Sequence, residues 1–265
     1  MVSIQPVSRD RHASKHWQRF SSYEFAQKTA VAPLVMAEFP KATQSFPIGF
    51  IKEADRYFPV AVLGIEPNVN LYVGPDGRWI GGYIPASLRG YPFRIGETEA
   101  GEQLLCIDED SGLITDPPEG LPFFDENGDL TADVQQILVF LGQTYQNRAA
   151  TLDVCKLLAG AGLIVPWDIK IVADDGEKAL QGLHRIDEEA LNKLDTGQFE
   201  KIRQAAALPL VYSQLLSMQH VKLLGKLTDA RAQRAALMAK ETPKVPELTQ
   251  SLTESDTIDW SKFGM

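Results

Sequence analysis

Short apolar segments alternate with glycine, proline, asparagine and aspartate between residues 46 and 108, and this pattern is typical of β-strands joined by tight turns. The dipeptides Asp76-Gly77 and Asn127-Gly128 favour hairpin turns, because the central residues of such a turn adopt positive φ. We therefore predict a mainly antiparallel sheet in the N-terminal half of the chain. The predicted strands cover residues 46–51, 58–65, 69–73, 78–84 and 104–108.

The pattern changes at residue 131, after which apolar residues recur at helical spacing. We predict a helix over residues 131–147 with Thr131 as its N-cap, and a second helix over residues 149–158. Glycines 160 and 162 are expected to end the second helix. The remaining predicted elements are a hairpin that turns at Asp175-Gly176, a short helix capped by Asp187, and a helical region over residues 198–239.

These elements predict an α+β protein with a helical C-terminal half that contains one β-hairpin. Residues 1–239 are expected to form a single domain, because no linker separates the two halves. Residues 240–265 contain two prolines, many polar residues and little periodicity, so we predict a disordered tail. Trp260 and Phe263 form an aromatic patch near its end and are candidates for docking onto a partner.

The charge and the apolar content of the chain limit the classes of function. The 265 residues carry a formal net charge of −9, which argues against binding to nucleic acid or to anionic lipid. The N-terminus lacks the apolar core of a signal peptide, and no apolar run reaches the length of a membrane span. We therefore expect a cytoplasmic protein without membrane insertion. Cys106 and Cys155 lie in apolar runs and are expected to be buried, reduced thiols.

Metal-binding patterns are sparse in this chain. His12 and His16 are four residues apart, a spacing that places zinc ligands on one face of a helix. The sequence between them lacks the glutamate of a zinc protease, and the other reading is a pair of solvated or packed histidines. We expect no metal and no cofactor. The carboxylates that could complete a metal site are Glu38, Asp108, Glu109 and Asp187.

Candidates for catalysis come from the same polar residues. The acidic run that begins at Asp108 could hold a carboxyl group whose pKa is raised by its neighbours, or it could be the solvated end of a strand. The chain lacks a nucleophile elbow, a phosphate-binding loop and a dinucleotide-binding motif, so the sequence leaves open whether the protein is an enzyme. The candidate catalytic residues are His12, Glu38, Asp108 and Glu109.

The segment over residues 70–93, NLYVGPDGRWIGGYIPASLRGYPF, is the most unusual in composition, and Arg94 follows it directly. Its glycines allow close backbone approach, its aromatic rings offer flat apolar faces, and its arginines offer paired donors to a carboxylate. The segment could hold a peptide or an acidic ligand; alternatively, the aromatic rings pack on the sheet and the arginines cover them. The candidate partner-binding residues are Trp79, Tyr83, Arg89, Tyr91, Phe93 and Arg94.

Several motifs occur in an order that resembles the SapC family. They include PLVMAEF at residues 33–39, FPIGF at 46–50, GRWIGGYIPASLRGYPF at 77–93, CIDE at 106–109 and GLHRIDEEAL at 182–191. Gly90 stands where the family pattern has an arginine, which weakens an argument for a paired-arginine site. The resemblance implies a link to bacterial surface layers, and similar genes tend to lie beside TonB-dependent receptors and peptide-modifying oxygenases or halogenases.

From the residues and the resemblance we expect a cytoplasmic accessory or binding protein. Its partner would be a peptide or protein linked to a cell-surface system, such as a peptide-modifying enzyme or an outer-membrane receptor. The alternative is an enzyme that modifies peptides, with a metal as one option for its mechanism. A structural component of a surface layer is a third hypothesis.

Overall fold

The computed structural model describes residues 3–174 and 176–241, and its contacts divide the chain into two compact units. The first unit, Met1–Asp229, holds every strand found among the described residues. The second unit, Ala230–Met265, is described only as far as the end of one helix. The expected disordered tail, with its docking candidates Trp260 and Phe263, falls beyond the described residues. Within the described ranges, no helix has both the length and the apolar character that a membrane span requires.

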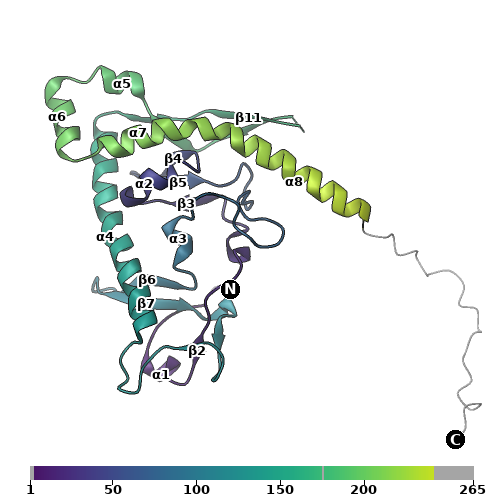
Figure 1. Ribbon diagram of the computed structural model, residues 1–265. Coiled ribbons are helices and arrows are strands. Elements are labelled where there is room, and N and C mark those ends of the chain that lie inside the picture. The colour runs from purple at the N-terminus through teal and green to yellow at the C-terminus, as the bar shows by residue number, and fades with distance from the viewer. Residues whose placement is uncertain (1–2, 175, 242–265) are drawn as a thin grey trace, which may run out of the picture. The chain divides into compact units, whose positions relative to one another are not determined.

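A five-stranded antiparallel sheet is the larger of the sheets in the first unit (Figure 1). At its centre β4 (Ile48–Glu53) and β5 (Arg56–Val62) form a hairpin, whose turn places Ala54 at a φ of 50°. These two strands confirm the predictions for residues 46–51 and 58–65. The order of the sheet is β10 (Ile164–Pro166), β13 (Leu183–Ile186), β4, β5 and β3 (Val31–Pro33).

A second sheet has the order β1 (Ile4–Pro6), β7 (Gln103–Asp108) and β6 (Phe93–Glu97). Strand β7 confirms the predicted strand over residues 104–108. Strand β6 was not predicted, because its sequence FRIGE contains a glycine and two charged residues and lacks a clear alternation. A small sheet of two-residue strands has the order β8 (Ile114–Thr115), β2 (His16–Trp17) and β9 (Leu121–Pro122), and the expected hairpin of β11 (Ile169–Ala173) and β12 (Gly176–Leu180) forms a sheet of its own.

The predicted strands over residues 69–73 and 78–84 are wrong, although the turn between them is present. Gly77 adopts the expected positive φ of 73°. The described residues on either side of the turn form only an isolated bridge, between Val73 and Trp79. Regular pairing stops there because the Trp79 indole donates a hydrogen bond of 2.7 Å to a main-chain carbonyl four residues later, which directs the chain away from the hairpin.

One helix of 29 residues, α4 (Ala132–Gly160), runs beside both sheets (Figure 1). The prediction of two separate helices is wrong, because residues 146–149 contain neither proline nor glycine and continue the helix. The predicted ends are confirmed: Thr131 occupies the N-cap position, and the helix ends at Gly160. The Thr131 hydroxyl donates to a carbonyl outside the helix instead of accepting a bond from its first turn.

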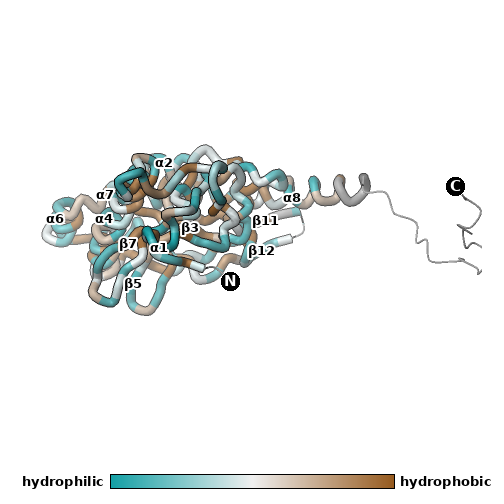
Figure 2. Tube along the Cα trace, turned by 90° about the horizontal axis from the view of Figure 1, so that it is seen from below, coloured by the Kyte–Doolittle hydropathy of each residue, from teal (hydrophilic) through white to brown (hydrophobic). Residues whose placement is uncertain are grey.

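The two halves of α4 are buried in two different hydrophobic clusters. Val134, near its start, packs in a cluster with Phe93, Leu105 and Ile107 of the three-stranded sheet of β1, β7 and β6. Leu158, near its end, packs in the larger cluster with Phe50 and the five-stranded sheet. Hydrophobic positions accordingly gather in the interior of the first unit, where these elements meet (Figure 2). The helix therefore sets the separation between the two sheets.

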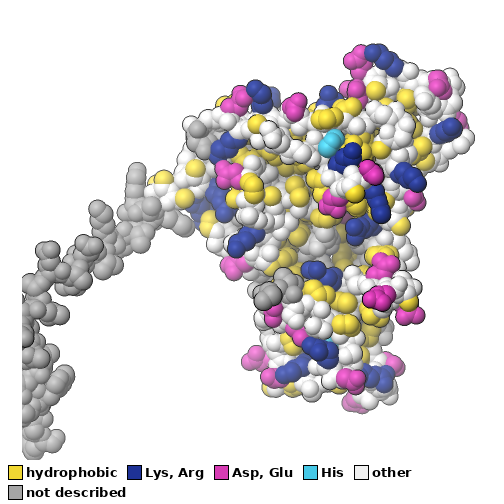
Figure 3. Space-filling view, turned by 180° about the vertical axis from the view of Figure 1, so that it is seen from behind, with side chains coloured by type: hydrophobic (Ala, Val, Ile, Leu, Met, Phe, Trp, Pro, Cys, Tyr) yellow, Lys and Arg dark blue, Asp and Glu magenta, His cyan; other side chains and the backbone are white. Residues whose placement is uncertain are grey.

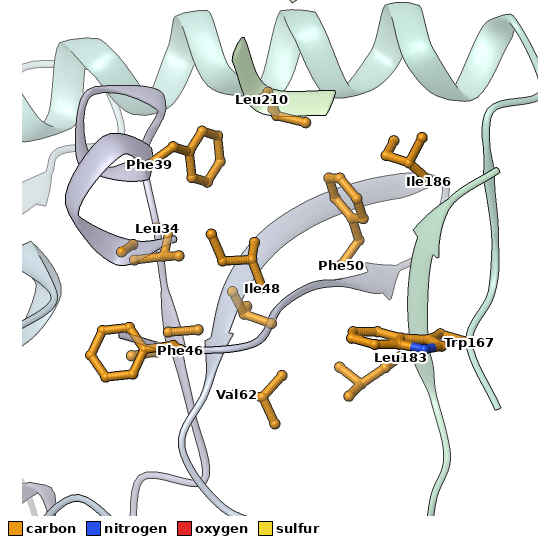
Figure 4. Packing of buried hydrophobic residues seen from close by; sticks show 14 of the residues in the cluster. Leu34, Phe39, Phe46, Ile48, Phe50, Val62, Trp167, Leu183, Ile186 and Leu210 are labelled. Atoms are coloured by element: carbon orange, nitrogen blue, oxygen red, sulfur yellow. The ribbon is translucent and has the colours of Figure 1, made fainter. Parts of the chain in front are cut away.

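The predicted helical region over residues 198–239 is divided into α6 (Thr196–Gln204), α7 (Leu208–Ser217) and α8 (Val221–Glu241). Side chains from α2, α7, β4 and β13 converge in the larger cluster (Figure 4). Asp187 caps α5 as predicted. The remaining helices are α1 (Arg9–His12), α2 (Phe39–Ala42), α3 (Ala86–Arg89), α5 (Glu188–Asn192) and the 3-10 turns η1 (Glu24–Ala26), η2 (Met36–Glu38), η3 (Glu109–Ser111) and η4 (Met218–His220).

A buried amide side chain holds α7 on the five-stranded sheet. The Gln214 Nε2 donates to the carbonyl of Ile48 at 3.1 Å, and its Oε1 accepts from the N–H of Ile186 at 2.9 Å. The Ser217 Oγ accepts from the N–H of Ile48 at 2.9 Å. These side chains satisfy backbone groups that would otherwise be buried without a partner.

We predict that Gln214→Met lowers the free energy of unfolding by about 2–4 kcal/mol, because it leaves one backbone donor and one acceptor buried and unpaired. Gln143→Met, on the exposed surface of α4, is the matched control and should change stability by less than about 0.5 kcal/mol. Urea unfolding at pH 7 measures both variants. Equal stabilities of the two variants would contradict the assigned role of Gln214.

Candidate functional site

A cleft of about 290 Å³ lies between the two sheets, beside the middle of α4. Ile51 and Phe58 of the β4–β5 hairpin line one side, and Phe93 and Ile95 of β6 line the other. Leu141 of α4 contributes to the wall between them. The lining is mostly apolar, and the volume is at the lower end of the range for ligand pockets in proteins. The cleft therefore has room for a few side chains of a ligand.

Glu38 lies at the cleft with only 4% of its surface exposed. Its Oε1 accepts hydrogen bonds from the Tyr83 hydroxyl at 3.0 Å and from the Ala86 N–H at 2.6 Å, and its Oε2 accepts from the Val35 N–H at 3.0 Å. Burial raises the pKa of Tyr83 to about 12, so its hydroxyl remains a donor at neutral pH. Glu38 thus ties η2 to the start of α3 through Oε1 and closes the first turn of η2 through Oε2.

Helix α4 holds the same turn from the opposite side. The Thr151 Oγ1 accepts from the N–H of Met36 at 2.9 Å, and the Asn147 Oδ1 accepts from the N–H of Ala37 at 3.1 Å. These N–H groups begin η2 and have no partner within the turn itself. The base of the cleft is therefore fixed by side chains from two separate segments.

Two arginines line the cleft with their side chains exposed. Arg94 extends from β6, and Arg148 extends from α4, with its guanidinium carbon 5.9 Å from the centre of the Phe58 ring. Neither arginine forms an ion pair within the part of the chain that the structure describes. Glu53 also lines the cleft and is exposed. Lysine and arginine side chains are interspersed with hydrophobic side chains on the surface seen from behind (Figure 3).

The predicted partner-binding residues are divided between different surroundings. Phe93 and Arg94 line the cleft, and Tyr83 lies behind it as a donor to Glu38. Arg89 and Tyr91 line a second hollow of about 300 Å³. The structure therefore does not bring all six residues onto one surface, and their role in binding stays a prediction.

Trp79, Arg89 and Tyr91 are engaged in packing, and the Trp79 ring stacks on Tyr72 with a centroid distance of 5.8 Å. The Arg89 guanidinium carbon lies 4.8 Å from the centre of the Phe140 ring, and its Nη2 donates to the Tyr83 hydroxyl at 3.2 Å. The Tyr91 ring stacks on Phe25 with a centroid distance of 3.9 Å and an interplanar angle of 7°. For these residues the structure agrees with the alternative in which aromatic rings pack and arginines cover them.

The catalytic candidates His12 and Glu109 meet away from the cleft. His12 is 1% exposed, and its Nε2 lies 3.4 Å from the Glu109 Oε1. The His12 Nδ1 accepts from the N–H of Ser8 at 3.2 Å. Burial lowers the pKa of His12, so the imidazole is neutral at pH 7. Hydrogen bonds from Arg11 hold the pKa of Glu109 below its usual value.

The remaining polar candidates have structural partners of their own. Asp108 accepts from the N–H of Asp110 at 3.2 Å and caps η3. His16 does not share a helix face with His12, because α1 ends at His12 and His16 begins β2. Glu38 and His12 have no partner in common. Within residues 3–174 and 176–241 there is no group of three or more histidine, cysteine or acidic side chains that could hold a metal ion.

Both cysteines are buried and free, as predicted, and burial raises the pKa of the Cys155 thiol to about 12. Sequence reasoning missed Arg148, Phe58 and Glu53 as residues of the cleft. They come from segments about ninety residues apart, and nothing local distinguishes Arg148 from any other exposed arginine of a helix.

We predict that Glu38→Ala lowers the free energy of unfolding by about 3 kcal/mol, because it leaves buried N–H groups without an acceptor. Tyr83→Phe removes one of the three donors and should cost about 1 kcal/mol. Glu53→Ala, an exposed glutamate of the same cleft, is the control and should have little effect. A change below 1 kcal/mol for Glu38→Ala in chemical denaturation would show that its hydrogen bonds do not hold the cleft.

Because the pKa of His12 is lower in the folded protein than in the unfolded chain, acid favours the unfolded state. The stabilisation is complete above the unfolded pKa of about 6.5 and is lost as the pH falls below it, towards the folded pKa. We predict that the free energy of unfolding falls between pH 7.5 and pH 5.5, and that His12→Gln makes this fall smaller. His16→Gln is the control. An unchanged pH dependence in His12→Gln would contradict the assignment.

The SapC family model matches residues 7–224. Among the described residues this range contains every strand except β1, together with all of α4 and the cleft, and it ends before the second unit begins. No curated protein and no solved structure matches the chain. The match covers most of the sequence and agrees with the order of motifs found in it. The chain belongs to the SapC family.

Proposed function

We propose that this protein is a binding protein that holds a peptide or protein partner in the cleft between its two sheets. The observation that carries the proposal is an apolar cleft with two exposed arginines that lack ion pairs among the described residues. Apolar walls favour the burial of hydrophobic side chains, and an arginine that forms no ion pair can bind a carboxylate of the partner.

The polar residues of the described region favour binding over catalysis. Both oxygens of Glu38 accept hydrogen bonds from groups that fix the local fold. His12 and Glu109 are close together, but His12 is almost completely buried. No specific observation on these residues favours the alternative of a peptide-modifying enzyme.

Membership of the SapC family supports the link to the cell surface. We propose that the protein acts in the cytoplasm as an accessory of such a system, with a peptide-modifying enzyme or the cytoplasmic form of a surface protein as its partner. The formal net charge of −9 gives no basis for attraction to nucleic acid or anionic lipid.

The test is affinity capture from native lysate followed by quantitative mass spectrometry. We expect one partner to be enriched by the full-length protein and by Arg78→Ala, a control at an arginine whose side chain is 84% exposed on a turn. The double variant Arg94→Ala/Arg148→Ala should reduce that enrichment about tenfold, since it removes both free cations of the cleft. A partner captured equally well by the double variant would overturn the assignment to the cleft.

A shortened protein that ends at Lys240 tests the tail in the same experiment. It lacks Trp260 and Phe263, which the sequence indicates as docking residues. Binding that survives this truncation but is lost in the double arginine variant places the contact in the cleft. Binding that is lost only on truncation places it in the tail and contradicts the proposal.

A further inference from the structure

Strand β6 lies at the edge of its sheet and faces the cleft. The order of that sheet is β1, β7, β6, so β6 pairs with β7 on one side, and no other strand of the described residues pairs with it on the other. In Figure 1, β6 is the strand of this sheet that lies nearer to the five-stranded sheet. A free strand edge presents unpaired N–H and C=O groups that can template another strand.

The hydrogen bonds at the two ends of β6 show which backbone groups point outward. The Asp108 N–H donates to the carbonyl of Pro92 at 3.0 Å, and the Thr98 N–H donates to the carbonyl of Glu102 at 2.9 Å. Antiparallel pairing alternates, so even-numbered residues of this strand bond to β7 and odd-numbered residues point away from it. The backbone groups of Ile95 and Glu97 are therefore directed to the open edge.

The cleft meets β6 along this edge. Phe93, Arg94 and Ile95 all line it, although consecutive side chains of a strand point to opposite faces. No residue of β7 lines the cleft. The cleft therefore contacts three successive residues of β6 and none of β7. It lies beside the open edge of β6, in the position that an additional strand would occupy.

Two arginines without a carboxylate partner in the described part of the chain favour an acidic ligand at this edge. Glu97 accepts a hydrogen bond of 3.0 Å from the Tyr145 hydroxyl, whereas Arg94 and Arg148 have no carboxylate partner within the described part of the chain. Glu53 and the buried Glu38 also line the cleft and equal the two arginines in number, but Glu38 is engaged by the Val35 and Ala86 N–H groups and the ion pairs of the described residues join neither acid to Arg94 or Arg148. A carboxylate near the two guanidinium groups would gain charge-assisted hydrogen bonds.

We propose that the cleft binds an extended acidic peptide segment, which adds to the three-stranded sheet as a fourth strand along β6. Main-chain bonds to Ile95 and Glu97 supply affinity, and side chains supply selectivity. An apolar side chain of the peptide enters the cleft towards Ile51 and Phe58, and a carboxylate two residues away meets Arg94 and Arg148. This inference rests on the proposed function and specifies the chemistry of the partner.

The test uses the full-length protein labelled with ¹⁵N and a set of synthetic heptapeptides in which glutamate alternates with leucine, valine or phenylalanine. We expect at least one peptide to bind and to slow hydrogen exchange of the Ile95 and Glu97 amides. Methylation of the peptide nitrogens that face β6 should weaken binding about tenfold or more, because it removes donors of the new ladder. Lysine in place of glutamate should weaken it to a similar degree.

Variants of the protein provide the second arm. Arg94→Ala/Arg148→Ala should lose about tenfold in affinity for the glutamate peptides, Glu53→Gln should bind them at least as tightly as the original protein, and Arg78→Ala should be unchanged. Unaltered binding after nitrogen methylation, or equal binding of the lysine peptides, would overturn the proposed strand addition or its acidic preference.

The outcomes separate this inference from the proposed function. If none of the heptapeptides binds while affinity capture yields a partner that depends on the two arginines, strand addition is wrong and the binding function stands. If neither the heptapeptides nor a cellular partner depends on these arginines, both proposals fail.

Discussion

The continuity of α4 is the constraint on which the rest of the structure depends. Its first half is buried against the three-stranded sheet and its second half against the five-stranded sheet. Since a helix rises about 1.5 Å per residue, the distance along the axis between its two buried halves determines how far apart the sheets lie. The cleft occupies the interval between them, beside a stretch of α4 that includes Leu141 and Arg148.

The polar side chains at the cleft are of two kinds. Glu38, Thr151 and Asn147 are used to hold η2 against α3 and α4, so they make the cleft rigid and leave little hydrogen-bonding capacity for a ligand. Arg94 and Arg148 form no ion pair among the described residues, and although Arg148 lies over the Phe58 ring, its N–H donors, like those of Arg94, stay available to a partner. A rigid apolar groove with a few free polar groups is the arrangement that recognition sites commonly have.

Local patterns predicted much of the architecture. The hairpin of β4 and β5, the turns at Gly77 and Gly128, and the cap of α5 follow from apolar alternation and from residues that tolerate positive φ or accept hydrogen bonds from a first turn. The strands that were predicted wrongly failed for a reason that lies outside the local pattern. Strands over residues 69–73 and 78–84 were replaced by side-chain hydrogen bonds such as that of Trp79, and local periodicity carries no information about such contacts.

By itself the sequence determined the α+β class, the antiparallel pairing at the centre of the larger sheet, the burial of both cysteines and the family, because each depends on neighbours along the chain or on motifs in order. The tertiary structure alone decided which polar residues meet. It separated His12 from Glu38 and brought Arg94 beside the same cleft as Arg148. Which polar side chains come close together depends on how the two hydrophobic clusters pack against α4, and no local sequence pattern contains that information.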